Sequence, residues 1–232
     1  MSKMTEAATE GGTTAIAAEN APKRSRWQRV WSKYLRPAIV LTVLLTILTG
    51  FIYPGIITGI AQLIFPGQAN GSLISVNGKV IGSDLIGQYW TRLEYFHGRP
   101  SATVNQNTGQ PEPYNAENSS ASNLGPTNKV LMQDVQQRVA AWKAEFKAEG
   151  LPVPSGPVPV DLVTTSGSGL DPDITIAGAL YQVPVVAKAR GLSDSQVQQL
   201  VMRHVHGRFL GIFGEPYVNV LELNMALDGL KQ

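Results

Sequence analysis

Residues 38–65 read AIVLTVLLTILTGFIYPGIITGIAQLIF and contain no charged side chain. About 20 mainly apolar residues suffice to cross the hydrocarbon core of a bilayer, so this run is long enough to span one. A buried core helix rarely needs so long a run, and a cleaved signal peptide has an apolar core of only about 7 to 15 residues before a small-residue cleavage site. The sequence therefore predicts an uncleaved transmembrane helix over residues 37–65.

The residues that precede this helix are basic. Residues 1–36 carry seven Lys or Arg and three Glu, and six of these basic residues lie between Lys23 and Arg36. Because basic flanks are retained in the cytoplasm, we expect residues 1–36 to form a cytoplasmic tail, its first 20 or so residues disordered. Residues 66–232 then form a domain on the far side, which is the periplasm if the membrane is a bacterial inner membrane.

Small side chains recur along the predicted span. Lipid tails give helices no hydrophobic reason to associate, so small residues matter there because they let a second backbone approach closely. We expect a packing seam for partner helices at five such residues: Thr42, Thr46, Gly50, Gly55 and Gly59. The alternative is a lone anchor that merely tolerates them. Pro54 is expected to kink the helix or to end its regular part.

The composition of the remaining chain excludes some functions. Residues 37–232 carry 12 basic and 14 acidic side chains, and a mildly acidic body does not offer the basic face that nucleic acid requires. The chain has no cysteine, so it forms no disulfide and no thiolate metal site. His204 and His206 are two residues apart, unlike the i, i+4 pair of a zinc helix, so we expect no metal site.

The first half of the domain contains a hairpin, a long loop and a helix. Asn77-Gly78 suits a type I′ turn between short β-branched segments, which predicts a β-hairpin. Residues 98–126 are rich in Pro, Asn, Ser and Gly and predict a long polar loop, a kind of segment that is usually functional or mobile. Thr127 opens an amphipathic helix that ends near Gly150, with an apolar stripe of Leu131, Val135, Val139, Trp142 and Phe146.

The second half alternates predicted strands and helices. Residues 158–164 are expected to form a buried strand, and Asp171-Pro172 to begin a helix that Pro184 interrupts. Ser193 and Gln196 match a capping box at the start of the next helix. Residues 217–223 are expected to form a final strand and residues 224–230 a closing helical turn. The fold class is thus a single-pass transmembrane helix followed by an α+β extracytoplasmic domain.

The turn Ser166-Gly167-Ser168-Gly169 raises two possibilities for chemistry. A phosphate-binding loop would need G-x-x-x-x-G-K-[ST], and Ser166 stands where the elbow motif G-x-S-x-G of hydrolases has its first glycine. Asp171 and Asp173 would also repel an anion at the helix that we expect to follow. A membrane-anchored periplasmic hydrolase that uses Ser168, and an anchored scaffold for an unrelated complex, remain the alternative functions.

Several short segments between Arg36 and Leu227 together form a recognisable pattern. They are Arg36-Pro37-Ala38, Tyr53-Pro54, Phe65-Pro66, Leu85-Ile86-Gly87-Gln88, Tyr95-Phe96, Arg99-Pro100-Ser101-Ala102, Ser122-Asn123-Leu124, residues 157–162, residues 166–172, Gly214-Glu215-Pro216 and Val218-Asn219-Val220-Leu221. In these segments the chain resembles the C subunit of the Kdp potassium-transporting P-type ATPase. Two positions depart from the family, which usually has Gly at Ala121 and His at Asp173.

The resemblance implies a subunit of an inner-membrane complex that is not an enzyme by itself. Its partners would be a potassium-channel-like A subunit, an ATP-hydrolysing B subunit and a small F subunit, with membrane lipid around the span. The family description adds a chaperone-like role that raises the affinity of the catalytic subunit for ATP, so ATP is implied as a cofactor through that subunit. On this reading the outer domain covers or braces the potassium entrance.

Overall fold

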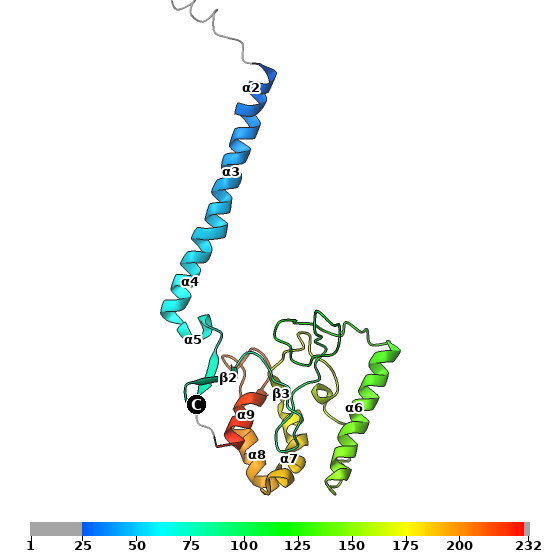
Figure 1. Cartoon of the computed structure of the whole chain (residues 1–232). Helices are drawn as coiled ribbons and strands as arrows, with labels where there is room; N and C mark the ends of the chain where they lie inside the picture. Colours follow the sequence, from blue (N-terminus) through cyan, green and yellow to red (C-terminus); the bar gives the residue numbers. More distant parts are fainter. Residues whose placement is uncertain (1–24, 230–232) are drawn as a thin grey trace, which may run out of the picture. The chain divides into compact units, whose positions relative to one another are not determined.

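The computed structural model describes residues 25–229, so the first 20 or so residues, which were predicted to be disordered, and the predicted end of the last helix at Leu230 lie outside it. The chain divides into two units, Met1–Phe65 and Pro66–Gln232. In the first, one continuous helix runs from Arg26 to Ile64, through α2 (Arg26–Val30), α3 (Arg36–Ile47) and α4 (Tyr53–Ile64) (Figure 1). It is the one helix of the described residues that is long and apolar enough to cross a membrane.

Two π-helical turns interrupt the α-helical hydrogen bonding of this helix. They cover Trp31–Leu35 and Leu48–Ile52, and each ends two residues before a proline, Pro37 or Pro54. Proline has no N–H to donate and its ring crowds the carbonyl one turn earlier, and a wider turn relieves that crowding. Pro54 was expected to kink the helix or to end its regular part. The second alternative is confirmed, because the regular α-helix ends at Ile47 and resumes at Tyr53.

The second unit begins with the short helix α5 (Pro66–Ala69) and the predicted hairpin. Strands β1 (Leu73–Val76) and β2 (Lys79–Ser83) pair in antiparallel fashion. Asn77 and Gly78 both have positive φ, 52° and 76°, as a type I′ turn requires of its two central residues. The hairpin prediction is therefore confirmed.

The predicted amphipathic helix is α6 (Lys129–Ala148). It begins two residues later than expected, because the side chain of Asn128 accepts a hydrogen bond from the Val130 N–H and caps the helix there. Trp142 and Phe146 of the predicted stripe are buried. The stripe faces the rest of the domain, as its periodicity predicted.

The expected strand over residues 158–164 is wrong. Val160–Leu162 form one turn of 3-10 helix, in a segment where Pro157 and Pro159 have no N–H for a sheet. The buried carboxylate of Asp161 accepts a hydrogen bond from the Thr175 N–H at 2.7 Å. A polar contact with a residue 14 positions along the chain thus replaces the strand pairing that the apolar sequence predicted.

The helix expected at Asp171-Pro172 begins later and runs further. Residues Asp173–Thr175 form strand β3, and α7 (Ile176–Arg190) starts after Thr175, whose hydroxyl accepts from the Gly178 N–H. Pro184 lies inside α7 without ending it, so the predicted interruption is wrong. Val183, Val185 and Val186 around it are buried, and this packing outweighs the lost hydrogen bond.

The last elements form a small sheet with α8 and α9. Helix α8 (Asp194–Arg203) has the predicted Ser193–Gln196 capping box. Strands β4 (Val205–His206) and β5 (Tyr217–Asn219) join β3 in an antiparallel sheet of order β3-β5-β4. The predicted strand over 217–223 is half wrong, because the Asn219 side chain accepts from the N–H groups of Leu221 and Glu222 and starts α9 (Val220–Leu227).

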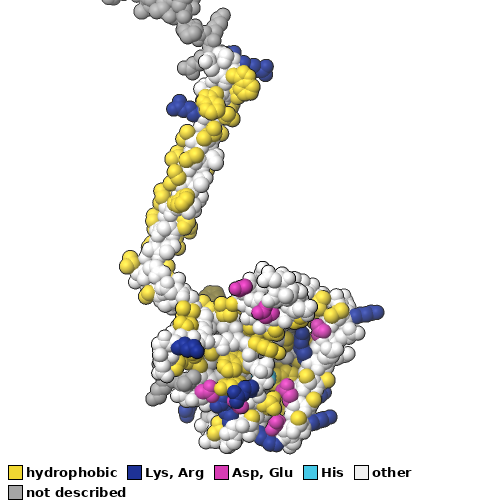
Figure 2. All heavy atoms as spheres, in the orientation of Figure 1, with side chains coloured by type: hydrophobic (Ala, Val, Ile, Leu, Met, Phe, Trp, Pro, Cys, Tyr) yellow, Lys and Arg dark blue, Asp and Glu magenta, His cyan; other side chains and the backbone are white. Residues whose placement is uncertain are grey.

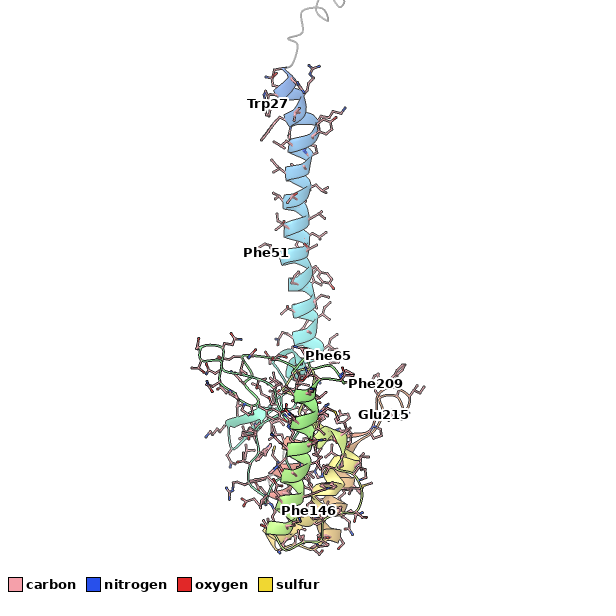
Figure 3. The ribbon with its side chains drawn as sticks, turned by 90° about the vertical axis from the view of Figure 1, so that its right-hand side faces the viewer. Trp27, Phe51, Phe65, Phe146, Phe209 and Glu215 are labelled. Atoms are coloured by element: carbon pink, nitrogen blue, oxygen red, sulfur yellow. The ribbon has the colours of Figure 1, made fainter. Side chains whose placement is uncertain are left out.

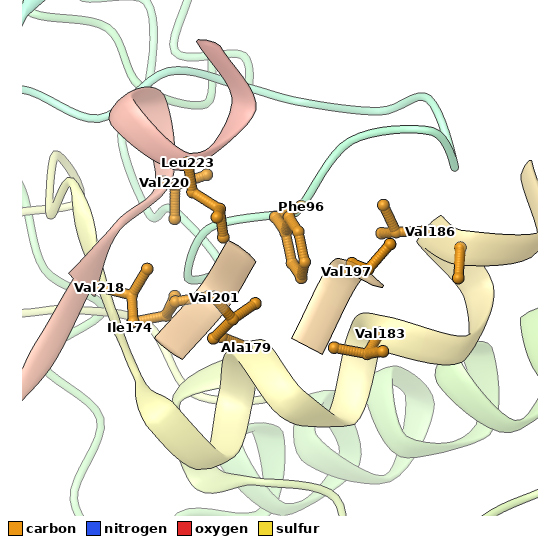
Figure 4. Packing of buried hydrophobic residues seen from close by; sticks show 11 residues of the cluster. Phe96, Ile174, Ala179, Val183, Val186, Val197, Val201, Val218, Val220 and Leu223 are labelled. Atoms are coloured by element: carbon orange, nitrogen blue, oxygen red, sulfur yellow. The ribbon is translucent and has the colours of Figure 1, made fainter. Parts of the chain in front are cut away.

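The main hydrophobic core lies between α7, α8, α9 and this sheet. Figure 4 shows the ring of Phe96 among side chains that come from all three helices, including Val197, Val201 and Leu223. Phe96 itself belongs to the irregular segment before the polar loop. A second, smaller cluster joins α6 to the 3-10 turn through Trp142, Leu162 and Val163. The observed mixture of helices and small antiparallel sheets confirms an α+β domain.

Candidate functional site

The helix Arg26–Ile64 presents its apolar side chains to its surroundings along its whole length (Figure 2). None of the side chains in its most apolar 18-residue window is buried within the chain. A Cβ added at Gly50, Gly55 or Gly59 would meet no atom within 4 Å. The predicted seam residues are therefore open to a neighbour, either a lipid or a helix of another chain.

The five seam residues lie along two lines of this helix. A four-residue repeat drifts by about 40° per step around a regular α-helix. The wider turn at Leu48–Ile52 opposes this drift, so Thr42, Thr46 and Gly50 stay close to one line. Pro54 continues the four-residue spacing of this first line. Gly55 is the next residue, which lies about 100° further around the helix, so Gly55 and Gly59 form a second line.

The polar loop of residues 98–126 is held by a network of hydroxyl groups. Thr103 is 2% exposed, and its Oγ1 accepts a hydrogen bond from the Asn115 N–H at 3.1 Å. The Ser101 hydroxyl donates to the carbonyl of Gly169 at 2.7 Å and accepts from the Tyr114 N–H at 3.0 Å. The sequence predicted that this segment is a loop without regular helices or strands. It did not predict the hydrogen bonds that hold the loop.

The Ser-Gly turn packs directly against this loop. The Ser120 N–H donates to the carbonyl of Ser168 at 2.8 Å, and a Cβ at Gly169 would lie 2.6 Å from the carbonyl oxygen of Ser120. Gly169 has φ of +69°, so both its conformation and its surroundings require glycine. The turn and the loop thus form one surface of the domain.

The N–H groups of the turn bind its own side chains. The Gly169 N–H donates to Ser166 Oγ at 2.8 Å, and the Leu170 N–H donates to Ser168 Oγ at 3.1 Å. Asp171, expected to cap a helix, instead pairs with Arg99 at 3.1 Å. A phosphate cradle needs converging free N–H groups, and two of the candidates, those of Gly169 and Leu170, are used within the turn.

The hydrolase alternative needs a histidine beside Ser168. The three histidines of the chain bind other groups: His97 contacts the carbonyl of Arg92, His204 that of Leu200, and His206 the carboxylate of Glu222 at 2.7 Å. The side-chain partner of Ser168 Oγ is Ser166 Oγ, at 3.5 Å. The geometry therefore gives Ser168 no base for nucleophilic attack.

Carboxylates gather where the sheet meets the hairpin. Burial, followed by the nearby Asp171 carboxylate, raises the pKa of Asp173 to about 6. Burial and Glu222 likewise raise the pKa of Asp84. Among residues 25–229, no group of three or more His, Asp or Glu side chains has the arrangement of a metal site. The sequence singled out Asp173 but gave no sign that Asp84 and Glu222 lie near it.

A cleft of about 280 Å³ lies between α6 and the start of the polar loop. Its walls include Tyr89, Trp90, Arg99, Arg138, Trp142 and Glu145. Three buried polar atoms there have no hydrogen-bond partner: Trp90 Nε1, Arg99 Nε and Glu145 Oε2. Burial raises the pKa of Glu145. No local motif pointed to this cleft, because its walls come from segments about 50 residues apart.

Comparison with known proteins identifies the family. The family described as "KdpC: K+-transporting ATPase, c chain" matches residues 35–229. A protein of Rhodopseudomonas palustris (strain BisB18) named "Potassium-transporting ATPase KdpC subunit" is 56% identical over 86% of this chain and 99% of its own length. Proteins with the same name from Sorangium cellulosum and Methylobacterium nodulans are 54% and 53% identical, each over 85% of this chain and 98% of their own. The chain therefore belongs to the KdpC family.

Proposed function

We propose that this chain is the membrane-anchored accessory subunit of a potassium-transporting ATPase. The family match over residues 35–229 carries the proposal, and the exposed apolar helix Arg26–Ile64 supports it. The chain does not catalyse the reaction itself. Transport and hydrolysis belong to partner subunits: a potassium-channel-like A subunit, an ATP-hydrolysing B subunit and a small F subunit.

The span seats the chain against helices of these partners. Thr42, Thr46 and Gly50 give one line of close approach, and Gly55 with Gly59 gives another. Two lines about 100° apart suit contact with two neighbouring helices better than contact with one. The larger apolar side chains between them remain in contact with lipid.

The chain lies in the bacterial inner membrane with its N-terminus in the cytoplasm and residues 66–232 in the periplasm. The basic residues from Lys23 to Arg36 support this orientation. The mildly acidic domain covers or braces the potassium entrance, where negative charge raises the local concentration of cations. The rigid surface made by the polar loop and the Ser-Gly turn suits such a bracing role.

The chain raises the affinity of the catalytic subunit for ATP indirectly, through the membrane helices. A periplasmic domain does not meet cytoplasmic ATP, and the N–H groups of residues 169 and 170 are used within the turn. Coupling through packed helices needs only that the span favours one arrangement of its partners over another. This role needs no nucleotide site in the chain.

Growth on limiting potassium tests the proposed function. The full chain is expressed in a bacterial strain that has the other potassium-ATPase subunits but lacks its own c chain. We expect it to restore growth at micromolar potassium and to co-purify with the ATP-hydrolysing subunit. A chain without residues 26–64 is the control and should do neither. Full expression in the membrane without growth and without co-purification would contradict the proposal.

A further inference from the structure

The loop that joins β4 to β5 ends in a cluster of exposed apolar side chains. We define residues 207–216 as the hairpin tip. Phe209, Leu210, Ile212 and Phe213 lie within five consecutive residues and are 62–73% exposed. Figure 3 shows the segment that bears Phe209 and Glu215 extending outward from the folded domain.

These side chains do not contribute to the folding of the domain. Neither hydrophobic cluster includes a residue of the hairpin tip. The strands that carry the tip are fixed below it by the pairing of Val205 with Val218 and of His206 with Tyr217, whose rings stack with centroids 4.9 Å apart. A compact exposed apolar patch that no packing requirement explains marks an interaction site.

Most backbone N–H groups at the apex of the hairpin tip form hydrogen bonds within the tip. The N–H groups of Phe209 and Phe213 donate to each other's carbonyls at 2.9 and 3.0 Å. Gly211 and Ile212 donate to the carbonyls of Arg208 and Phe209. Four of the five N–H groups of residues 209–213 are thus paired within the tip. In hydrocarbon each unpaired backbone group is costly, so the pairing of these four N–H groups lowers the cost of moving the tip out of water.

Charged residues mark the point where the apolar part of the tip ends. Arg208 Nη2 lies 2.7 Å from Glu215 Oε2, directly behind the four apolar residues. Arg203, in the last turn of α8, is a second exposed basic residue nearby in the chain. Apolar side chains in front of a charged base match the polarity change between the acyl region of a bilayer and its headgroups.

The connection to the span keeps the domain close to a membrane. Phe65 ends the apolar helix region and Leu73 starts β1, and the eight peptide steps between them reach at most about 28 Å. A domain of this size has a radius of gyration of only about 15 Å, so a short tether holds its surface near lipid. Tethering makes tip insertion intramolecular, and a few apolar side chains are then enough.

We infer that the hairpin tip inserts its four apolar side chains into the headgroup and upper acyl region of the bilayer that the span crosses. The lipid bilayer, rather than an apolar pocket of a partner protein, is favoured by the short tether and by the N–H groups that are paired within the tip. Insertion fixes the height and tilt of the domain over the membrane. This inference rests on the membrane anchoring proposed above and does not depend on the partner subunits.

Fluorescence in lipid alone tests the inference. A single cysteine is introduced as Ile212→Cys in the full, naturally cysteine-free chain, labelled with the dye NBD and placed in nanodiscs of phosphatidylcholine and phosphatidylglycerol. Asn107→Cys, on an exposed turn of the polar loop, is the matched control. We expect blue-shifted emission at position 212, quenching by lipids with a nitroxide in the upper acyl chain, and several-fold lower quenching by iodide than at position 107.

A second variant tests the role of the aromatic rings. Phe209→Ser with Phe213→Ser, in the Ile212→Cys chain, should return the emission and the iodide quenching to those of position 107. Both rings are exposed, so the fold is retained. Equal iodide quenching at positions 212 and 107 in the nanodiscs would overturn the inference. Protection of position 212 only after partner subunits are added would also overturn it, in favour of protein docking.

Discussion

The side-chain amide of Asn224 forms both hydrogen bonds of the Phe96 backbone. The Phe96 N–H donates to Asn224 Oδ1 at 2.8 Å, and Asn224 Nδ2 donates to the Phe96 carbonyl at 2.9 Å. Gln182 does the same for His97, which donates at 2.7 Å and accepts at 3.0 Å. Two amide side chains, from α9 and α7, therefore replace neighbouring strands for an irregular segment that carries the core ring of Phe96.

Replacing Asn224 tests this arrangement. Asn224→Leu leaves the buried N–H and carbonyl of Phe96 without partners, and we expect the free energy of unfolding of the domain to fall by about 3 kcal/mol. Asn107→Leu, at an exposed side chain, should change it by less than about 0.5 kcal/mol. Thermal unfolding of the full chain in detergent, followed by near-ultraviolet circular dichroism, measures both. Equal midpoints for the two variants would contradict the prediction.

The raised pKa of Asp173 predicts a pH dependence of stability. Its pKa is about 6 in the folded domain and about 3.9 in the unfolded chain, so folding favours the neutral acid. The stability that this carboxyl contributes is fully present below pH about 4 and is lost as the pH rises through about 6. Asp173→Asn keeps an acceptor for Asn219 Nδ2 and removes this loss.

We therefore expect Asp173→Asn to raise the unfolding midpoint relative to the parent chain more at pH 7 than at pH 4. Glu117→Gln removes an exposed carboxylate and serves as the control, with a similar small effect at both values. Midpoints measured at pH 4, 5, 6 and 7 give the comparison. If the difference in unfolding midpoint between Asp173→Asn and the parent chain did not change with pH, the Asp173 carboxyl would ionise in the fold as it does in the unfolded chain.

The two lines of small residues on the span predict separate assembly defects. Thr46→Leu with Gly50→Leu blocks one line, and Gly55→Leu with Gly59→Leu blocks the other. Each pair should lower recovery of the complex several-fold in co-purification, because a Leu side chain prevents close approach of a second backbone. Ile56→Leu with Ile60→Leu keeps the volume and should have no effect. Parent-like recovery of both blocked variants would rule out the seam.

Cysteine labelling tests the orientation of the chain. Ser25→Cys and Ser155→Cys both occupy exposed positions in a chain without natural cysteine. In intact cells whose outer membrane has been made permeable, a maleimide that does not cross the inner membrane should label position 155 and not position 25. Lysed cells should label both, which shows that both thiols react. The opposite pattern would place the domain in the cytoplasm and make direct contact with ATP possible.

Local signals predicted several elements well. The turn Asn77-Gly78 and the capping box of Ser193 act within a few residues, so their outcome does not depend on distant parts of the chain. The expected strand at 158–164 and the interruption at Pro184 were wrong for the opposite reason. The Asp161 carboxylate is fixed by Thr175, and α7 passes through Pro184 because valines around it are buried.

For the candidate site, too, local features could be predicted from the sequence and features that depend on the fold could not. Sequence spacing found the seam residues, but only the structure shows the π-helical turn at Leu48–Ile52, which keeps Thr42, Thr46 and Gly50 close to one line. The hairpin tip escaped notice because a short apolar run looks the same whether it is buried or exposed. Its exposure of 62–73% follows from the pairing of β4 with β5, which leaves the residues between them outside the core.

The sequence by itself determined that residues 37–65 contain an apolar helix long enough for a membrane and that an α+β domain follows it. Length, hydropathy and short-range caps and turns are local properties, so the sequence is enough to predict them. Only the tertiary structure decided how residues 98–126 are held, which carboxylates interact and which apolar residues stay exposed. Those outcomes depend on contacts between residues as far apart as Phe96 and Asn224, and burial of a polar group is decided by partners that no local pattern specifies.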